Sequence, residues 1–237
     1  MDAKSLKSDL EKICDEEKAI ILSRFFKTGV GQYGEGDKFM GVTVPKQREL
    51  IKNYDGMPLS EISKSISSEF HEVRLSTLLI MVNKFNKSCD ADRETIYNLY
   101  ISNTNYINNW DLVDLTAEHI VGVWLGDNYE SKLIPLAKSD LIWDRRIAMM
   151  ACFYHIKHGN SVPAFKIIEI LKNDSHDLIQ KAVGWMLREI GKRCSIDELK
   201  KWLKKEDQYK RLPRTTLRYA IEHFEPNERS KYLKGEV

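Results

Sequence analysis

Apolar residues recur every three or four positions along most of this chain, which is the spacing of one face of an α-helix. The pattern predicts one or two helices over residues 2–28, and from residue 58 it becomes a series of amphipathic helices. We expect longer helices at about 70–86, 110–125, 141–158, 176–193 and 211–224, and shorter ones at 58–67, 90–104, 130–139, 162–173 and 195–205. No convincing alternation of apolar and polar residues suggests a strand. The sequence therefore predicts an all-α protein.

The predicted helices pair at a period of 30 to 40 residues. This period is typical of an α-solenoid, a stack of antiparallel helix pairs of the HEAT-like type. Such a stack curves, and one helix of each pair lines its concave surface. We expect residues 1–237 to form a single domain of this kind.

A glycine-rich segment separates the N-terminal helices from the rest of the chain. It has neither the lysine nor the strand-to-helix context of a phosphate-binding or dinucleotide-binding loop. We interpret it as a flexible loop, and a proline directly after it is expected to begin the next helix. The residues concerned are Gly29, Gly31, Gly34, Gly36, Gly41 and Pro45.

The segment Asn109-Trp110-Asp111 carries the signals of a helix start. Asn109 can cap a helix that opens at Trp110, and Asp111 then lies in the first turn, where the helix dipole stabilises a carboxylate. Asp114 follows Trp110 by four residues, so an indole and a carboxylate share one face of the helix. An indole beside a carboxylate is a good receptor for a cation.

Aligning the longer helices by their apolar positions brings five residues into register, 40, 32, 35 and 33 residues apart: Arg74, Asp114, Arg146, Lys181 and Arg214. A repeated basic residue on one face of a solenoid predicts a concave basic groove that binds the phosphates of a nucleic acid. The alternative is that these residues form ion pairs between repeats or cover apolar surface with their stems. The single carboxylate, Asp114, would repel phosphate, so we expect it to have a separate role in stabilising developing positive charge.

Composition and charge agree with a nucleic-acid partner without requiring one. The chain is 42% hydrophobic and 30% charged, as expected of a folded globular protein. Residues 1–140 carry 17 Lys and Arg against 22 Asp and Glu, whereas residues 141–237 carry 20 against 13, so the C-terminal part is basic. With no apolar leader segment and no run of about 18 apolar residues, we expect a cytoplasmic protein without a membrane partner. The four cysteines are scattered and predict neither a metal site nor a disulfide framework.

Several segments resemble the DNA alkylation repair family, the AlkD-type DNA glycosylases. They are residues 108–114 (NNWDLVD), 142–146 (IWDRR) and 180–189 (QKAVGWMLRE), together with 33–42 (YGEGDKFMGV) followed by Pro45 and Arg48. The resemblance covers nearly the whole chain. It implies a fold of stacked HEAT-like helix pairs and excision of N3- or N7-alkylated purines from duplex DNA, without flipping of the base into the enzyme.

Carried onto this chain, the resemblance makes Asp114 the catalytic carboxylate. Trp110 and Trp185 would contact the deoxyribose and backbone at the lesion, and Arg146 would hold the DNA nearby. Phe25 stands where a family member can have a tyrosine, so its DNA contact is open. Lys181, Arg74 and Arg214 would bind phosphates, as their register predicts.

The chemistry expected of such an enzyme follows from the charge of its substrate. Alkylation at N3 or N7 makes the purine cationic, so it leaves without a general acid, and the transition state places positive charge on the sugar. An ionised Asp114 can stabilise that charge. We expect no metal and no cofactor, no obligate protein partner, and a monomer. Two alternatives remain: a DNA-binding family member without excision activity, and a HEAT-repeat scaffold for proteins.

Overall fold

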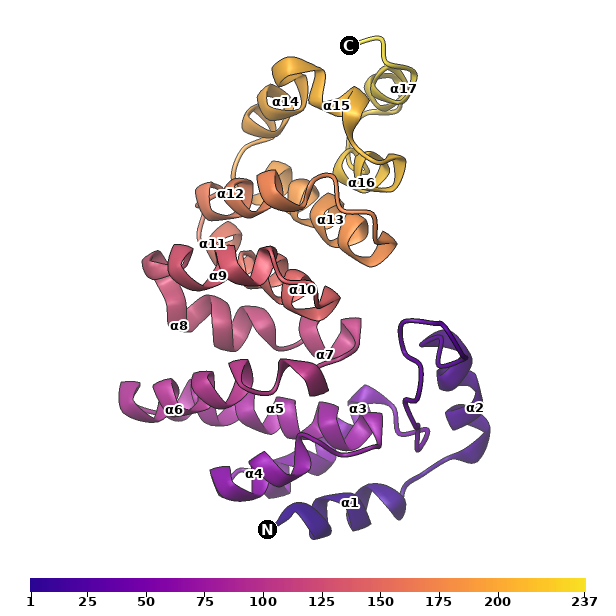
Figure 1. Ribbon diagram of the computed structural model, residues 1–237, viewed down its shortest axis with the longest axis vertical. Coiled ribbons are helices and arrows are strands. Elements are labelled where there is room, and N and C mark those ends of the chain that lie inside the picture. The colour runs from indigo at the N-terminus through magenta and orange to yellow at the C-terminus, as the bar shows by residue number, and fades with distance from the viewer. The chain divides into compact units, whose positions relative to one another are not determined.

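The computed structural model describes residues 1–237 and consists of helices without strands; a single β-bridge joins Lys38 to Phe70 (Figure 1). None of the helices combines the length and the apolar character needed to cross a membrane. Contacts divide the chain into two compact units, residues 1–116 (unit 1) and 117–237 (unit 2). Each unit is built from packed helices, as the predicted α-solenoid requires, whereas the predicted single domain and concave groove remain predictions.

Unit 1 is organised around α5 (His71–Lys87), in which every residue from His71 to Val82 is buried. Helix α5 packs against α1, α3, α4, α6 and α7. Helix α2 has no buried residue, and it stands apart from the stacked helices of this unit (Figure 1). The other elements are α1 (Ala3–Glu11), α2 (Glu16–Phe25), α3 (Val44–Leu50), η1 (Ile51–Tyr54), α4 (Leu59–Ser65), α6 (Asp90–Ile101), η2 (Thr104–Tyr106) and α7 (Trp110–Asp114).

Unit 2 is organised around α13 (Asp177–Arg193), which packs against α10, α11, α12, α14 and α16. Gly184 permits a close approach of α13 to α16, because a Cβ at this position would lie 2.6 Å from the carbonyl oxygen of Thr216. The remaining elements are η3 (Glu118–Gly122), α8 (Val123–Leu125), η4 (Gly126–Asn128), α9 (Glu130–Ala137), α10 (Ile142–Ala151), α11 (Phe153–Lys157), α12 (Val162–Leu171), α14 (Ile196–Lys204), η5 (Lys205–Asp207), α15 (Gln208–Arg211), α16 (Arg214–Ala220) and α17 (Pro226–Lys234).

The end of the glycine-rich loop between α2 and α3 is held by a side chain of α5. The buried carboxylate of Glu72 accepts hydrogen bonds from the backbone N–H groups of Met40, Gly41 and Val42 at 2.9, 2.8 and 3.2 Å. Gly41 has a φ of 81°, and a Cβ there would lie 1.9 Å from the carbonyl oxygen of Asp15. Glycine is therefore needed at this position for close packing as well as for its backbone conformation.

The helix predicted over residues 110–125 is interrupted. Helix α7 ends at Asp114, Leu115 and Thr116 form a turn, and the chain resumes as a π-helix, η3. Apolar spacing alone did not reveal the break, because the same residue types continue across it. The predicted helix 141–158 likewise divides at Cys152 into α10 and α11, and that predicted over 211–224 is confined to α16.

Candidate functional site

Helix α7 places a carboxylate and an indole on one face, as the sequence predicts. The side chain of Asn109 accepts a hydrogen bond from the backbone N–H of Trp110 at 2.8 Å and so caps the helix. Trp110 and Asp114 lie one turn apart and are both half-buried, whereas Leu112 and Val113 are fully buried in unit 1. Trp110 and Asp114 are thus accessible from solvent, whereas Leu112 and Val113 anchor the helix.

An aromatic cluster surrounds the indole of Trp110. Phe26 stacks on it with the ring centroids 5.1 Å apart, and Phe25 contacts it edge-on at 5.8 Å. The indole N–H donates to the hydroxyl of Tyr33 in the glycine-rich loop at 3.2 Å. Phe25 is 60% exposed and Phe26 is buried, so the cluster presents one apolar ring to solvent beside Trp110. The sequence had placed Phe25 near the site only loosely, and the structure puts it in contact with Trp110.

Behind Asp114 lies a buried hydroxyl pair. Tyr100 and Thr116 share a hydrogen bond of 2.9 Å, and the Thr116 hydroxyl donates to the carbonyl of Leu112. Burial, with a contribution from the negative charge of Asp114, raises the pKa of the Tyr100 phenol well above its usual range.

A buried ionic network lies on the other side of α7. His71 Nδ1 is 3.0 Å from the carboxylate of Asp37 and Nε2 is 2.8 Å from that of Asp111, and Arg74 also binds Asp37. Burial of the ring opposes the charged form, but the neighbouring carboxylates of Asp111 and Asp37 raise the pKa of His71 to about 9. Burial also opposes ionisation of Asp37, yet His71 and Arg74 hold its pKa below the usual value. These side chains join the glycine-rich loop, α5 and α7.

This network changes the interpretation of Asp111. The sequence predicts a dipole-stabilising residue, and Asp111 does accept a hydrogen bond from the N–H of Leu112 at 2.9 Å in the first turn. Its other oxygen, however, binds His71 in the interior. Sequence reasoning missed Asp37 and His71, although Asp37 lies within a segment that carries the family resemblance.

The row of basic residues does not form a uniform set of solvent-facing cations. Arg74 is buried and also donates to the carbonyl of Ser68 and the side chain of Asn108. Arg146 is buried in unit 2, where it donates to the carbonyl of Leu178. The hydrogen bonds of Arg74 and Arg146 therefore favour the alternative interpretation of the row, in which these residues hold neighbouring parts of the fold together. They do not favour the predicted contact with phosphate.

The two other basic residues of the row reach solvent. Lys181 is 2.6 Å from the carboxylate of Asp177 one turn before it on α13, and its side chain is 40% exposed. Arg214, at the start of α16, is exposed and donates to the carbonyl of Leu233 at 2.7 Å. The exposed ion pair of Lys181 with Asp177 is weak, so this cation can rearrange toward a phosphate.

Trp185 belongs to a second aromatic and ionic group, within unit 2. Its indole N–H donates to Glu189 at 3.2 Å, and its ring lies 5.9 Å from that of Phe153. Arg193 binds Glu189 at 2.7 Å and lies over the Phe153 ring, as does Lys157. Burial opposes ionisation of Glu189, but its arginine partners and Trp185 lower its pKa. Trp185 is half-buried, so part of its indole remains accessible.

Lys27 is a candidate contact that sequence reasoning missed. It follows Phe26 directly, is exposed, and has a left-handed backbone with a φ of 53°. Its ammonium group lies 5.9 Å from the centre of the Tyr33 ring, whose hydroxyl binds Trp110. A non-glycine residue in this conformation costs free energy unless its surroundings fix it, and such residues occur often at functional sites. Nothing in the sequence alone distinguishes this lysine from the other lysines.

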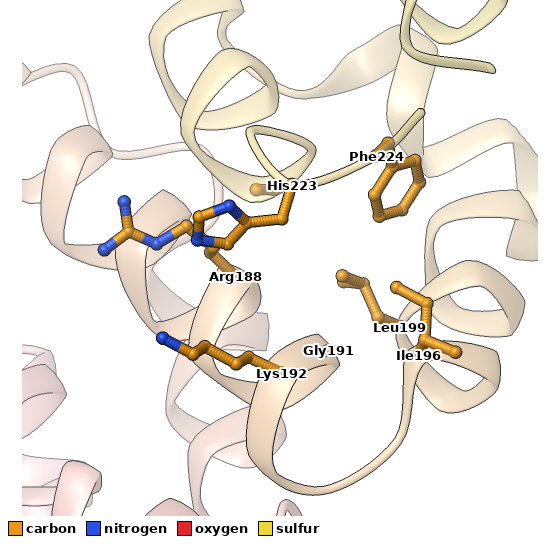
Figure 2. A pocket seen from close by; sticks show the side chains of 8 residues that line it. Arg188, Gly191, Lys192, Ile196, Leu199, His223 and Phe224 are labelled. Atoms are coloured by element: carbon orange, nitrogen blue, oxygen red, sulfur yellow. The ribbon is translucent and has the colours of Figure 1, made fainter. Parts of the chain in front are cut away.

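Unit 2 also contains a cleft of about 260 Å³ between the end of α13, the start of α14 and the end of α16 (Figure 2). Its walls are largely apolar, and Figure 2 shows the side chains of Arg188, Lys192 and His223 on one side of it, across from those of Ile196, Leu199 and Phe224. None of the residues predicted for the site lines this cleft, and it contains no carboxylate. It therefore offers no group that could stabilise an oxocarbenium ion.

The family model described as DNA alkylation repair enzyme matches residues 6–224. A solved structure, a predicted DNA alkylation repair enzyme from Enterococcus faecalis, superposes with a TM-score of 0.65 at 17% sequence identity, over 90% of this chain and 97% of that one. At that identity the likeness shows the fold. Among curated proteins no match was found.

Proposed function

Because the chain belongs to the DNA alkylation repair enzyme family, we propose that it is a monofunctional DNA glycosylase that releases cationic N3- and N7-alkylated purines from duplex DNA. The observation that carries the proposal is the half-buried carboxylate of Asp114, one helical turn from the half-buried indole of Trp110. Family membership indicates alkylation repair and DNA as the substrate class, and the arrangement on α7 provides the chemistry.

The reaction breaks the bond between C1′ of the sugar and the purine nitrogen. The bonding electron pair moves to the alkylated purine, which leaves as a neutral base and needs no proton from the protein. Positive charge develops on the sugar, where the carboxylate of Asp114 stabilises it and the face of Trp110 adds a cation–π interaction. Water then adds to C1′ and loses a proton to solvent. A neutral damaged base is a poor substrate, because no acid in this arrangement protonates the leaving group.

Exposed groups around this pair supply contacts to the DNA. Phe25 presents its ring beside Trp110 and covers the sugar edge, whereas Lys27 binds a phosphate close to the lesion. In unit 2, Trp185, Lys181 and Arg214 supply further contacts to the DNA. We assign Arg74 and Arg146 to holding the fold, because both are buried. The enzyme acts as a monomer and uses neither metal nor cofactor.

The test is single-turnover release of 7-methylguanine from a duplex, with spontaneous depurination in buffer as the baseline. We expect Asp114→Asn to slow release by about 100- to 1,000-fold, the range for removing one preorganised electrostatic group, while duplex binding is retained. Asp127→Asn is the matched control, because it makes the same chemical change at an exposed acid. Baseline release by the wild type, with salt-sensitive DNA binding intact, would instead support a non-excising DNA binder. Loss of DNA binding altogether would support a protein scaffold.

A further inference from the structure

The helix that carries Asp114 is too short to hold itself in place. Helix α7 has five residues, and isolated helices of this length are unstable in water. The direction of the carboxylate and the indole therefore depends on what fastens α7 to the rest of unit 1. Leu112 and Val113 supply burial, and the cap residue Asn109 is itself tied to Asp37 by a hydrogen bond of 3.4 Å.

The strongest polar attachment of α7 is the contact between Asp111 and His71. The His71 side chain is 2% exposed and lies between two carboxylates, Asp111 from α7 and Asp37 from the glycine-rich loop. Both ring nitrogens can donate only when the ring carries two protons. Phe26 and Phe39 cover the ring, with centroids 5.1 and 4.5 Å away, so water is excluded from the contact.

The two carboxylates that contact His71 are each paired with a cation, whereas the neighbouring carboxylate of Glu72 is held by backbone N–H groups of the loop. The charged groups facing His71 are Asp37 and Asp111, and Arg74 binds Asp37 from the next turn of α5. The two carboxylates of Asp37 and Asp111 thus face two positive groups, the guanidinium of Arg74 and the protonated ring of His71. Loss of the proton on His71 leaves one largely buried carboxylate facing a ring nitrogen lone pair, which is unfavourable.

The same arrangement ties the glycine-rich loop to the proposed site. Asp37 belongs to the loop that also carries Tyr33, and the Tyr33 hydroxyl accepts a hydrogen bond from Trp110. His71 and Tyr33 therefore fasten consecutive residues of α7, Asp111 and Trp110, to one loop. A change at His71 is transmitted to the indole and the carboxylate without any contact between His71 and DNA.

We propose that His71, held between Asp37 and Asp111, is a positioning residue that fixes α7 so that Asp114 and Trp110 meet the sugar of the damaged nucleotide. The inference rests on the proposed glycosylase function and adds a regulatory element, because His71 donates to both carboxylates at once only while it is doubly protonated. Alkaline pH removes one of the two hydrogen bonds, loosens the attachment of α7 and lowers the rate of base release. DNA affinity is unaffected, because the ring is buried.

The experiment compares wild type with His71→Gln in single-turnover release of 7-methylguanine, in parallel with duplex binding, across a series of pH values. Glutamine is neutral and has both N–H donors on one nitrogen, so it cannot reproduce the two opposed N–H groups of the charged ring. We expect His71→Gln to slow release by about 10- to 100-fold, since a displacement of about 1 Å can cost about 100-fold, while the dissociation constant for duplex changes less than about twofold. The wild-type rate, corrected for spontaneous release, falls as pH rises through about 9, and the variant lacks this fall.

Asp111→Asn provides a second readout, one that a merely structural role would not change. The amide keeps the shape of the side chain but removes a carboxylate that raises the pKa of His71, so the alkaline fall in rate moves to lower pH. The exposed His158, changed to Gln, is the control. Thermal unfolding of each variant establishes a temperature at which all of them are folded.

The outcomes separate the inference from the proposed function. If the wild type releases no base above the spontaneous rate, the glycosylase function fails and the positioning role fails with it. If the wild type releases base and His71→Gln is as fast, or retains the alkaline fall, the positioning role alone is wrong. A slower variant with a flat pH profile, together with the shifted profile of Asp111→Asn, supports it.

Discussion

The buried imidazole predicts that unit 1 loses stability at mildly alkaline pH. The folded-state pKa of His71 is raised from 6.5 to about 9. Below pH 6.5 both folded and unfolded chains bind the proton, so the contribution to stability is fully present. Between these pH values only the folded chain holds the proton, and each pH unit removes about 1.4 kcal/mol. Above about pH 9 the contribution is lost.

Over the whole interval this amounts to about 3 kcal/mol, a large part of the roughly 5–15 kcal/mol that stabilises a typical domain. The assay is urea denaturation followed by circular dichroism, for wild type and His71→Gln at matched pH values. The difference in unfolding free energy between the two proteins should shrink by about 3 kcal/mol between pH 6.5 and a pH above 9. Comparing the two proteins removes the contribution of all other groups that titrate in this range.

His158→Gln serves as the control, because His158 is exposed and has no carboxylate partner; it contacts the backbone carbonyl and the ring of Tyr154. Its difference from the wild type should stay constant with pH to within about 0.5 kcal/mol, as is usual for a surface substitution. A difference between wild type and His71→Gln that does not change with pH would refute the reasoning. The ring would then be neutral in the folded protein.

Other predictions follow from the loop and from the exposed lysine. Glu72→Gln turns an amide N–H₂ toward a backbone N–H of the loop and should cost about 2–3 kcal/mol in urea denaturation. Gly41→Ala should destabilise the protein further, because its methyl group would overlap the carbonyl oxygen of Asp15, and the thermal midpoint measures this. Lys27→Gln should weaken duplex binding and reduce the slope of log affinity against log salt by about 1, as a titration over several salt concentrations would show. Prior treatment with a chelator should leave base release unchanged, because the proposed chemistry needs no metal.

Local sequence signals identified the long helices because their information lies within one or two turns. Helices α5 and α13 begin and end within one residue of the predicted ranges. The cap at Asn109 was also predictable, since a side-chain oxygen needs only the backbone N–H groups that follow it. The turn at Leu115 and Thr116 was not, because the apolar periodicity continues through it and the break reflects the packing around each segment.

The partners of the charged residues depended on contacts between residues far apart in the chain. Arg74 and Arg146 have the residue type and register of phosphate contacts, yet both are buried and bonded to other parts of their units. The register of the helices indicates which residues are equivalent on successive helices. It does not indicate which of these residues other segments of the same chain bury. In the same way, nothing in the spacing of Asp37, His71 and Asp111 indicates that they meet.

The sequence by itself determined the helical class, the helix-pair period, the helix start that sets Trp110 and Asp114 on one face, and the resemblance that suggested a role for them. These properties depend on residue type and on spacing over a few residues, and both can be read directly from the sequence. Tertiary structure alone decided that α7 is a single short turn, that the glycine-rich loop is pinned by Glu72, and that His71 binds the loop and α7 together. Buried charges are stable only when partners from distant segments neutralise them, and the folded chain is what brings those partners together.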